Sequence, residues 1–367
     1  MIPKLIQESS DLLSKMYDDK QILFSYSSIQ KNNTLFNDFY HPSVIRYTIN
    51  SLLGIQKAKS LYKLNWDLNQ ILNNFISKNA HRISNPGDKG IFLYILSTSR
   101  HEKKDSYAKE LLDILIERKL WSELSLQDIS WAFLGLIKYI ELNNDSSITE
   151  SVEKLFKYID EYFLNKDTFI PYHNLRLLRK AFVSFGAVTY FLLSLYEYSR
   201  VYNDQHAKSI FKECCLRIMS LQGEYGEWPW FIDTKTGKVL DWYEAYSVHQ
   251  DSMAMLFLFR AINLGIEEAK SSIIKSYKWL FGANELGVRM LTRRPFFIYR
   301  SIRRKEKWER EKRFLRATVL HVLNKSGKKL DSSYLEINRE CRSYHLGWIL
   351  FVWSGVDNFN EFVELEL

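Results

Sequence analysis

Aromatic, acidic and amide side chains are concentrated in one stretch of the chain, between Gln222 and Asp251. Folding does not require such a concentration, because connections between elements are normally built from small polar residues. Sugars present flat apolar C–H faces, which lie on aromatic rings, and hydroxyl groups, which need planar amide and carboxylate partners. The stretch supplies both kinds of group. We therefore predict that it forms the functional surface and binds a carbohydrate chain or a glycan precursor.

Three residues of this stretch are candidates for catalysis. Hydrolysis of a glycoside requires one protonated carboxyl group and a second carboxylate that acts as base or nucleophile. Asp241 and Glu244 are the best pair for these roles. His249 is the third candidate, as a general base or as a donor that orients the ligand, because its reference pKa lies near neutrality. Each also has a structural interpretation, since acids are common in first helical turns.

Other polar and aromatic residues are predicted to bind the substrate. Trp228, Trp230 and Trp242 would form a platform on which sugar rings stack, and Gln250 would orient hydroxyl groups. The remaining candidates of this kind are Tyr243, Tyr246, Asp251, His173, Arg176, Arg342 and His345.

Apolar residues recur with helical rather than strand spacing along most of the chain. Leu68, Ile71, Leu72 and Phe75, for example, line one face of a helix. Similar amphipathic helices are predicted near 107–120, 148–163, 206–220 and 266–281. Six further segments are apolar on nearly every face, which is typical of a buried helix. These segments are 44–55, 90–97, 129–140, 182–198, 249–264 and 345–356.

The alternation of buried and amphipathic helices predicts an all-α fold, an (α/α)6-type toroid of helical hairpins with inner and outer helix rings. A superhelical stack of repeats is the competing architecture. In a toroid the inner helices begin at one mouth, where their free N–H groups favour anionic or hydroxyl-rich ligands. Residues expected there, in addition to those above, are Tyr40, His41, Arg46, Asn85, Asp88, Asp128, Asn174, Arg179 and Tyr344.

This whole-chain pattern resembles the (α/α) toroid superfamily, which includes six-hairpin glycosidases, several polysaccharide lyases and epimerases, and the terpenoid cyclases. The motif Gln222-x-x-x-Gly226-x-Trp228 is similar to the Gln-Trp repeat of squalene and hopene cyclases, in which it caps helices and ties neighbouring hairpins together. The aspartate-rich protonation motif of those cyclases is not found in this chain. Isoprenoid cyclisation would require an apolar, aromatic-lined cavity with an acid at its top.

The clusters around His173 and His345 are similar in residue type to sites in toroidal polysaccharide lyases. There, Tyr, His, Asn and Arg neutralise a uronate carboxylate and move a proton. We therefore expect a carbohydrate-active protein that acts on a glycan or polysaccharide and resembles glycoside hydrolases, with a lyase on an acidic glycan as one alternative. The other alternative is a non-catalytic toroid that docks a glycosyltransferase or another component of polysaccharide assembly.

The formal net charge of +8 is concentrated in one segment. Residues 285–342 contain about ten more basic than acidic side chains, and we predict a basic insertion within a single domain that spans residues 1–367. Basic residues alternate with aromatic and aliphatic ones in 293–316. This part is expected to contact a membrane surface or a protein, to hold a phosphorylated donor, or to form a basic lip over an acidic polysaccharide. A solvated basic helix is the simpler interpretation.

Several classes of protein have no support in the sequence. No phosphate-binding loop, dinucleotide fingerprint or metal-ligand spacing is visible, so we predict no cofactor and no metal, and no nucleic-acid-binding motif is present. The three cysteines are expected to be reduced and buried. Because no long apolar run and no secretory signal are visible, a cytoplasmic location is expected.

Overall fold

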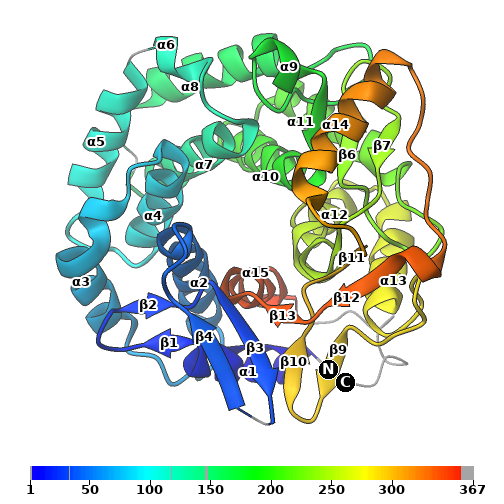
Figure 1. Cartoon of the computed structure of the whole chain (residues 1–367). Helices are drawn as coiled ribbons and strands as arrows, with labels where there is room; N and C mark the ends of the chain where they lie inside the picture. Colours follow the sequence, from blue (N-terminus) through cyan, green and yellow to red (C-terminus); the bar gives the residue numbers. More distant parts are fainter. Residues whose placement is uncertain (1, 33, 117, 144, 146–147, 357–367) are drawn as a thin grey trace.

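The structure is a computed structural model and describes residues 2–32, 34–116, 118–143, 145 and 148–356. Within these residues the helices form two concentric rings (Figure 1). The inner ring consists of α2 (Val44–Lys59), α4 (Pro86–Thr98), α7 (Leu126–Asn143), α10 (Phe185–Val201), the π-helical turn His249–Met253 with α12 (Met255–Asn263), and α15 (Ser343–Trp353). The outer ring consists of α1 (Ile2–Lys15), α3 (Leu68–Asn79), α5 (Lys104–Ile116), α8 (Thr149–Tyr158), α11 (Gln205–Met219) and α13 (Glu268–Leu280).

The ring is closed, because the last inner helix packs on the first. Helix α15 contacts α2 on one side and the outer helix α1 on another. The predicted toroid is therefore confirmed, and the elongated stack of repeats is wrong. Each of the six segments predicted to be buried overlaps an inner helix. Their all-round apolar character has a simple cause, since an inner helix is covered by a neighbour on either side and by an outer helix behind.

Two pairs of glycines bring inner helices into backbone contact. A Cβ atom on Gly135 of α7 would lie 2.1 Å from the carbonyl oxygen of Gly90 on α4. A Cβ atom on Gly54 of α2 would lie 2.0 Å from the carbonyl oxygen of Gly347 on α15. No side chain fits at such a distance, so glycine at these positions determines how closely the helices approach.

We expect the substitution Gly135→Ala to destabilise the fold. The added methyl group forces α7 away from α4, and overpacking of this kind typically lowers the free energy of unfolding by about 1–3 kcal/mol. Chemical denaturation measures the loss. Ser151→Ala on the exposed face of α8 is the control, with an expected change of no more than about 0.5 kcal/mol. Equal stability of the two variants would contradict the close contact.

Short antiparallel strands lie between the helices, although the sequence indicated no strand. They form the sheets β13-β3-β4, β5-β6-β7 and β12-β11-β8 and the hairpins β1-β2 and β9-β10. These strands have only two to five residues, too few for alternation to be recognisable. Their bounds are β1 (Tyr17–Asp18), β2 (Leu23–Phe24), β3 (Ser27–Lys31), β4 (Thr34–Asp38), β5 (Phe182–Ser184), β6 (Phe231–Asp233), β7 (Val239–Asp241), β8 (Ala245–Tyr246), β9 (Leu291–Arg293), β10 (Phe296–Ile298), β11 (Ser301–Arg304), β12 (Leu335–Asn338) and β13 (Glu340–Cys341).

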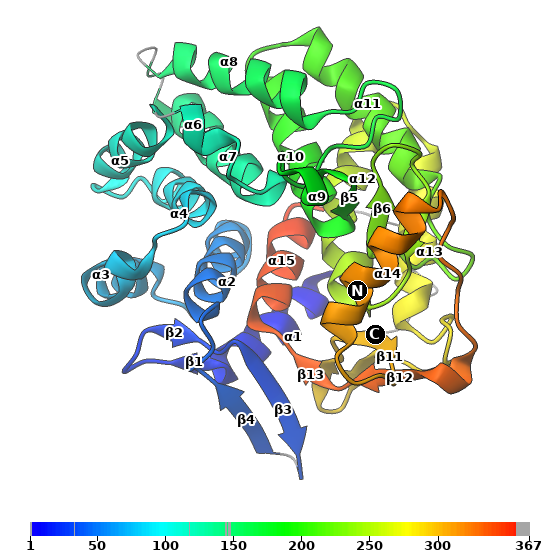
Figure 2. The same ribbon diagram turned by 45° about the horizontal axis from the view of Figure 1, so that its top comes forward.

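Shorter helices complete the structure. The basic segment 285–342 contains strands β9 to β13 and the helix α14, and is thus not a solvated helix alone. Helix α14 packs on β7 and lies beside α9 (Figure 2). The remaining helical elements are α6 (Arg118–Trp121), α9 (Leu177–Lys180), α14 (Glu309–Val322), the 3-10 turns Ala80–Arg82 and Ser332–Tyr334, and the π-helical turn Ile159–Phe163.

The three cysteines are buried and unbridged, as predicted. Among the described helices, none combines the length and apolar character needed to cross a membrane.

Candidate active site

Two adjoining pockets lie at the centre of the ring. The inner pocket, of about 290 Å³, is lined mainly by inner helices, and the outer pocket, of about 440 Å³, by strands, loops and α14. The two share Ser184, Trp230, Tyr246 and Arg300, so they form one continuous cavity. The inner pocket is further lined by Ser43, Arg46, Tyr47, Asn50, Gln127, Trp131, Gly186, Tyr190, His249, Met253 and Tyr344. The outer pocket is further lined by Tyr26, His173, Arg179, Phe231, Glu244, Arg313 and Phe314.

His249 lies in the inner pocket, in the turn that begins the fifth inner helix. Its ring is nearly parallel to that of Trp230, at 14° and a centroid distance of 5.8 Å, and the edge of Tyr246 meets it at 5.2 Å. Its Nδ1 atom is buried without a hydrogen-bond partner. Burial lowers the pKa of His249 to about 3, with a smaller contribution from neighbouring His345. His249 is therefore an uncharged imidazole at neutral pH.

Two histidines with a lowered pKa, His249 and His173, should make the fold sensitive to acid. Burial also lowers the pKa of His173 to about 4. A histidine whose folded pKa is depressed stabilises the protein fully above its unfolded value, near 6.5, and this stability is lost as the pH falls toward the folded value. We expect the thermal midpoint of His173→Gln to fall less than that of the parent between pH 7 and pH 4.5. Exposed His81→Gln is the control, and an identical pH dependence in all three proteins would contradict the expectation.

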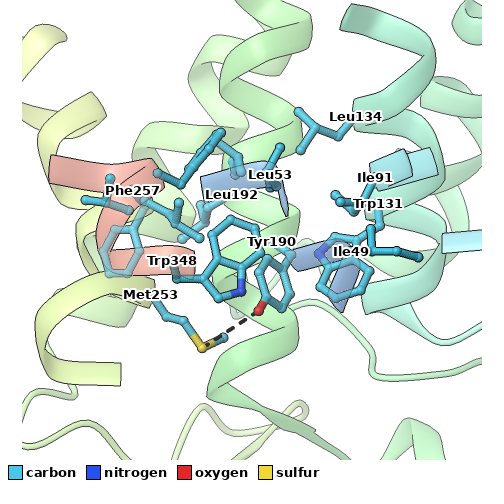
Figure 3. Close-up of a cluster of buried hydrophobic side chains, with 14 of the residues drawn as sticks. Ile49, Leu53, Ile91, Trp131, Leu134, Tyr190, Leu192, Met253, Phe257 and Trp348 are labelled. Atoms are coloured by element: carbon cyan, nitrogen blue, oxygen red, sulfur yellow. Dashed lines mark hydrogen bonds between the residues drawn. The ribbon is translucent and has the colours of Figure 1, made fainter. Parts of the chain in front are cut away.

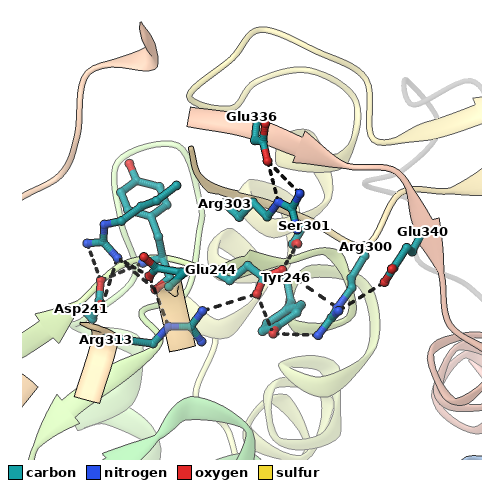
Figure 4. A network of polar contacts seen from close by, with 12 residues as sticks. Asp241, Glu244, Tyr246, Arg300, Ser301, Arg303, Arg313, Glu336 and Glu340 are labelled. Atoms are coloured by element: carbon teal, nitrogen blue, oxygen red, sulfur yellow. Dashed lines mark hydrogen bonds and ion pairs between the residues drawn. The ribbon is translucent and has the colours of Figure 1, made fainter. Parts of the chain in front are cut away.

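Glu244 faces the outer pocket but is held by several donors (Figure 4). It accepts hydrogen bonds from the hydroxyl groups of Tyr246, at 3.0 Å, and Ser301. The guanidinium groups of Arg313 and Arg300 lie 3.5 and 4.0 Å from its oxygens. Burial acts to raise the pKa of Glu244, but these donors outweigh it, and the net pKa is lowered. Glu244 thus remains ionised and is unsuited to act as a general acid.

Asp241 does not line the cavity. Its carboxylate is 1% exposed and forms a bidentate pair with Arg304, at 2.7 and 3.1 Å. Arg316 lies 3.7 Å from the same group. The structure therefore does not bring Asp241 and Glu244 together at the cavity as an acid and a base.

Of the three tryptophans predicted to form a stacking platform, Trp230 alone lines the cavity. Trp228 is fully buried, and its indole Nε1 donates to Ser276 of α13 at 2.9 Å. Gln222 lies 3.0 Å from both Ser276 Oγ and the carbonyl oxygen of Ser272 in the same helix. These contacts tie the loop after α11 to α13, which is the role that the similarity to the Gln-Trp repeat implies.

The other predicted binding residues differ in their placement. Tyr246 and His173 line the cavity, whereas Arg176 is exposed and Trp242 is half-buried against the ammonium group of Lys329. The following are buried and line neither pocket: Tyr243, Gln250, Asp251, Arg342 and His345. In this last group, Nε2 of His345 lies 2.7 Å from the Asp251 carboxylate and links α15 to the fifth inner helix.

The predicted mouth residues separate into lining and structural groups. Arg46, Arg179 and Tyr344 line the cavity. Arg46 also bridges three inner helices, because its guanidinium lies 2.7 Å from Asp88 and 2.9 Å from Asp128. The remaining predicted mouth residues do not line the cavity. Asn85 caps α4, and Asn174 donates to the carbonyl groups of Glu123 and Leu124. His41 stacks on Tyr26, and Tyr40 is 92% exposed.

Two groups of lining residues were not predicted from the sequence. Aromatic side chains of the inner helices, such as Trp131 and Tyr190, resemble core residues in sequence and do pack on one another, with ring centroids 4.9 Å apart (Figure 3). Arg300 and Arg313 belong to the segment identified as basic, but nothing in the sequence places them at the ring centre. Among the described residues, no cluster of His, Cys, Asp and Glu has the arrangement of a metal site.

The closed ring of six hairpins around a central cavity defines the fold as an (α/α)6 toroid. No known protein family matches the sequence, and no characterised protein does. Among solved structures, a sugar epimerase from a ruminal bacterium is similar to this chain, with a TM-score of 0.65 and 12% sequence identity. The alignment covers 98% of this chain and 100% of the epimerase chain.

Two further solved structures have the same ring. Cellobiose 2-epimerase from Bacillus thermoamylovorans (TM-score 0.65, 12% identity) matches 100% of this chain and 99% of its own. For unsaturated glucuronyl hydrolase from a Bacillus species (TM-score 0.58, 12% identity), the alignment covers 97% of this chain and 96% of the hydrolase chain. At these identities the likeness establishes the fold.

Proposed function

We propose that this protein is a carbohydrate-active enzyme that transfers a proton at a carbon atom of a sugar bound in the central cavity, with His249 as the proton-transferring group. The observation that carries the proposal is the uncharged, buried imidazole of His249 in the inner pocket, packed against the rings of Trp230 and Tyr246. The fold that the chain shares with two sugar epimerases supports the proposal by analogy.

Hydrolysis by a carboxylate pair has weaker support. Such a mechanism needs two carboxyl groups on either side of the scissile bond, one of them protonated. Among the described residues that line the two pockets, Glu244 is the only Asp or Glu, and its lowered pKa keeps it ionised. A hydrolase would have to recruit a second carboxyl group from outside this lining.

The geometry suggests a role for each side chain around His249. The apolar face of a sugar would rest on Trp230, and His249 would accept a proton from a carbon next to a carbonyl or carboxylate group. The resulting negative charge on oxygen would be stabilised by Arg300, whose Nη2 already donates to the Tyr246 hydroxyl at 3.1 Å. Protonation of the same carbon on its opposite face gives an epimer, and it requires the planar intermediate to turn its other face to His249. Departure of a leaving group on the next carbon instead gives an unsaturated sugar.

Reactions in isotopically labelled water distinguish the mechanisms. The protein is incubated with a panel of neutral and acidic mono- and oligosaccharides in D₂O and in H₂¹⁸O, and the products are analysed by NMR and mass spectrometry. We expect an epimer with deuterium at the reacting carbon, or a product with a new double bond. Incorporation of ¹⁸O at a new reducing end identifies a hydrolase and overturns the proposal. Binding without conversion of any sugar favours the non-catalytic alternative.

A further inference from the structure

Positive charge dominates the outer pocket. Its lining contains the guanidinium groups of Arg179, Arg300 and Arg313, but Glu244 is the only carboxylate among the described lining residues. The other titratable nitrogen there, that of His173, is uncharged at neutral pH because burial lowers its pKa to about 4. A pocket with this composition favours a ligand that carries negative charge.

Two of these arginines have donors that the protein leaves without a hydrogen bond. The Nε atoms of Arg300 and Arg313 are both buried and have no hydrogen-bond partner. Arg313 is 6% exposed, and the nearest carboxylate oxygens, on Glu244 and Glu309, lie 3.5 Å from its nitrogens. A buried donor without a partner is costly, and a guanidinium group is shaped to bind carboxylate or phosphate oxygens in pairs.

The same two arginines lie over the rings proposed to hold the sugar. The guanidinium carbon of Arg313 is 4.7 Å from the ring centroid of Trp230, and that of Arg300 is 5.1 Å from the ring centroid of Tyr246. Tyr246, Arg300 and Arg313 lie close together around Glu244 (Figure 4). Trp230 and Tyr246 line both pockets, so a sugar beside them would direct a substituent toward these arginines.

We infer that the outer pocket is a subsite for an oxyanion substituent of the sugar, a carboxylate, sulfate or phosphate group, bound by Arg300 and Arg313. This inference rests on the proposed function for the location of the sugar, but it does not depend on the reaction.

Binding measurements test the subsite without requiring turnover. Isothermal titration calorimetry on the full chain compares glucose with glucuronate, glucose 6-phosphate and glucose 6-sulfate, and the three charged sugars distinguish the kinds of anion. We expect at least one charged sugar to bind about 10-fold or more tightly than glucose. Arg313→Gln should reduce this preference by about 10-fold or more, and Arg313→Lys, which retains the charge, should reduce it less.

Arg303→Gln is the matched control. Arg303 is an exposed residue of the neighbouring strand β11; it pairs with Glu336 and does not line the outer pocket. Its replacement removes one positive charge, as Arg313→Gln does, but no contact with the anion proposed to bind in the pocket. Equal affinity for glucose and all three charged sugars overturns the subsite, as does a charged-sugar preference that survives Arg313→Gln unchanged. Failure of the proposed reaction would appear separately, in the labelled-water experiment.

Discussion

Replacement of His249 by glutamine is expected to lower the turnover number by about 100-fold to 10,000-fold, the range typical for loss of a general acid or base. Glutamine retains a planar polar group of similar size, so the sugar should still bind in the cavity beside Trp230 and Tyr246. The predicted signature is therefore a large fall in kcat with a dissociation constant within about threefold of the parent's. Steady-state kinetics and calorimetry measure the two quantities on the sugar that the labelled-water screen identifies.

The control for this variant is His81→Gln. His81 is exposed on the 3-10 turn Ala80–Arg82 and lines neither pocket, so its replacement should leave both quantities unchanged. A His249→Gln protein that retains at least a third of the parent's kcat would refute the role of His249 in proton transfer.

The second large effect concerns stability. Asp241→Asn should lower the free energy of unfolding by about 3 kcal/mol, because it leaves the buried guanidinium of Arg304 without its bidentate partner. Glu309, which lies 3.1 Å from Arg304, compensates in part and keeps the loss at the lower end of the usual range. Denaturant titration measures the change, and the kcat per folded molecule should stay close to that of the parent.

Glu336→Gln provides the comparison for the Asp241 variant. It breaks the pair between Arg303 and Glu336, whose side chains are 44% and 41% exposed, and should change the stability by no more than about 1 kcal/mol. If Asp241→Asn were as stable as the parent but inactive, the assignment of Asp241 as a catalytic acid or base would be restored.

The helical framework could be predicted because its signal is local. An inner helix such as α7 is apolar on nearly every face and an outer helix such as α3 on one face only, and both patterns are visible within a dozen residues. The short strands could not be predicted in the same way. A strand such as β8, with two residues, exists because β11 pairs with it from a distant part of the chain.

A residue of the candidate site could be predicted only where its position in the sequence is enough to determine its place in the fold. The position of Tyr246 and His249 at the start of the fifth inner helix brings both to the cavity. Asp241 is held away from the cavity by its ion pair with Arg304, 63 residues further along the chain. Trp228 is held away from it by its hydrogen bond to Ser276, 48 residues further along. Such pairings depend on the tertiary fold, and partners at this separation leave no pattern in the sequence.

The most direct test of the central claim is a crystal structure of the His249→Gln variant with the identified sugar bound. We predict that the sugar lies on the ring of Trp230, with its reacting carbon about 3–3.5 Å from the side chain at position 249. A sugar bound outside the two pockets, or one whose reacting carbon faces a carboxylate pair instead, would contradict it.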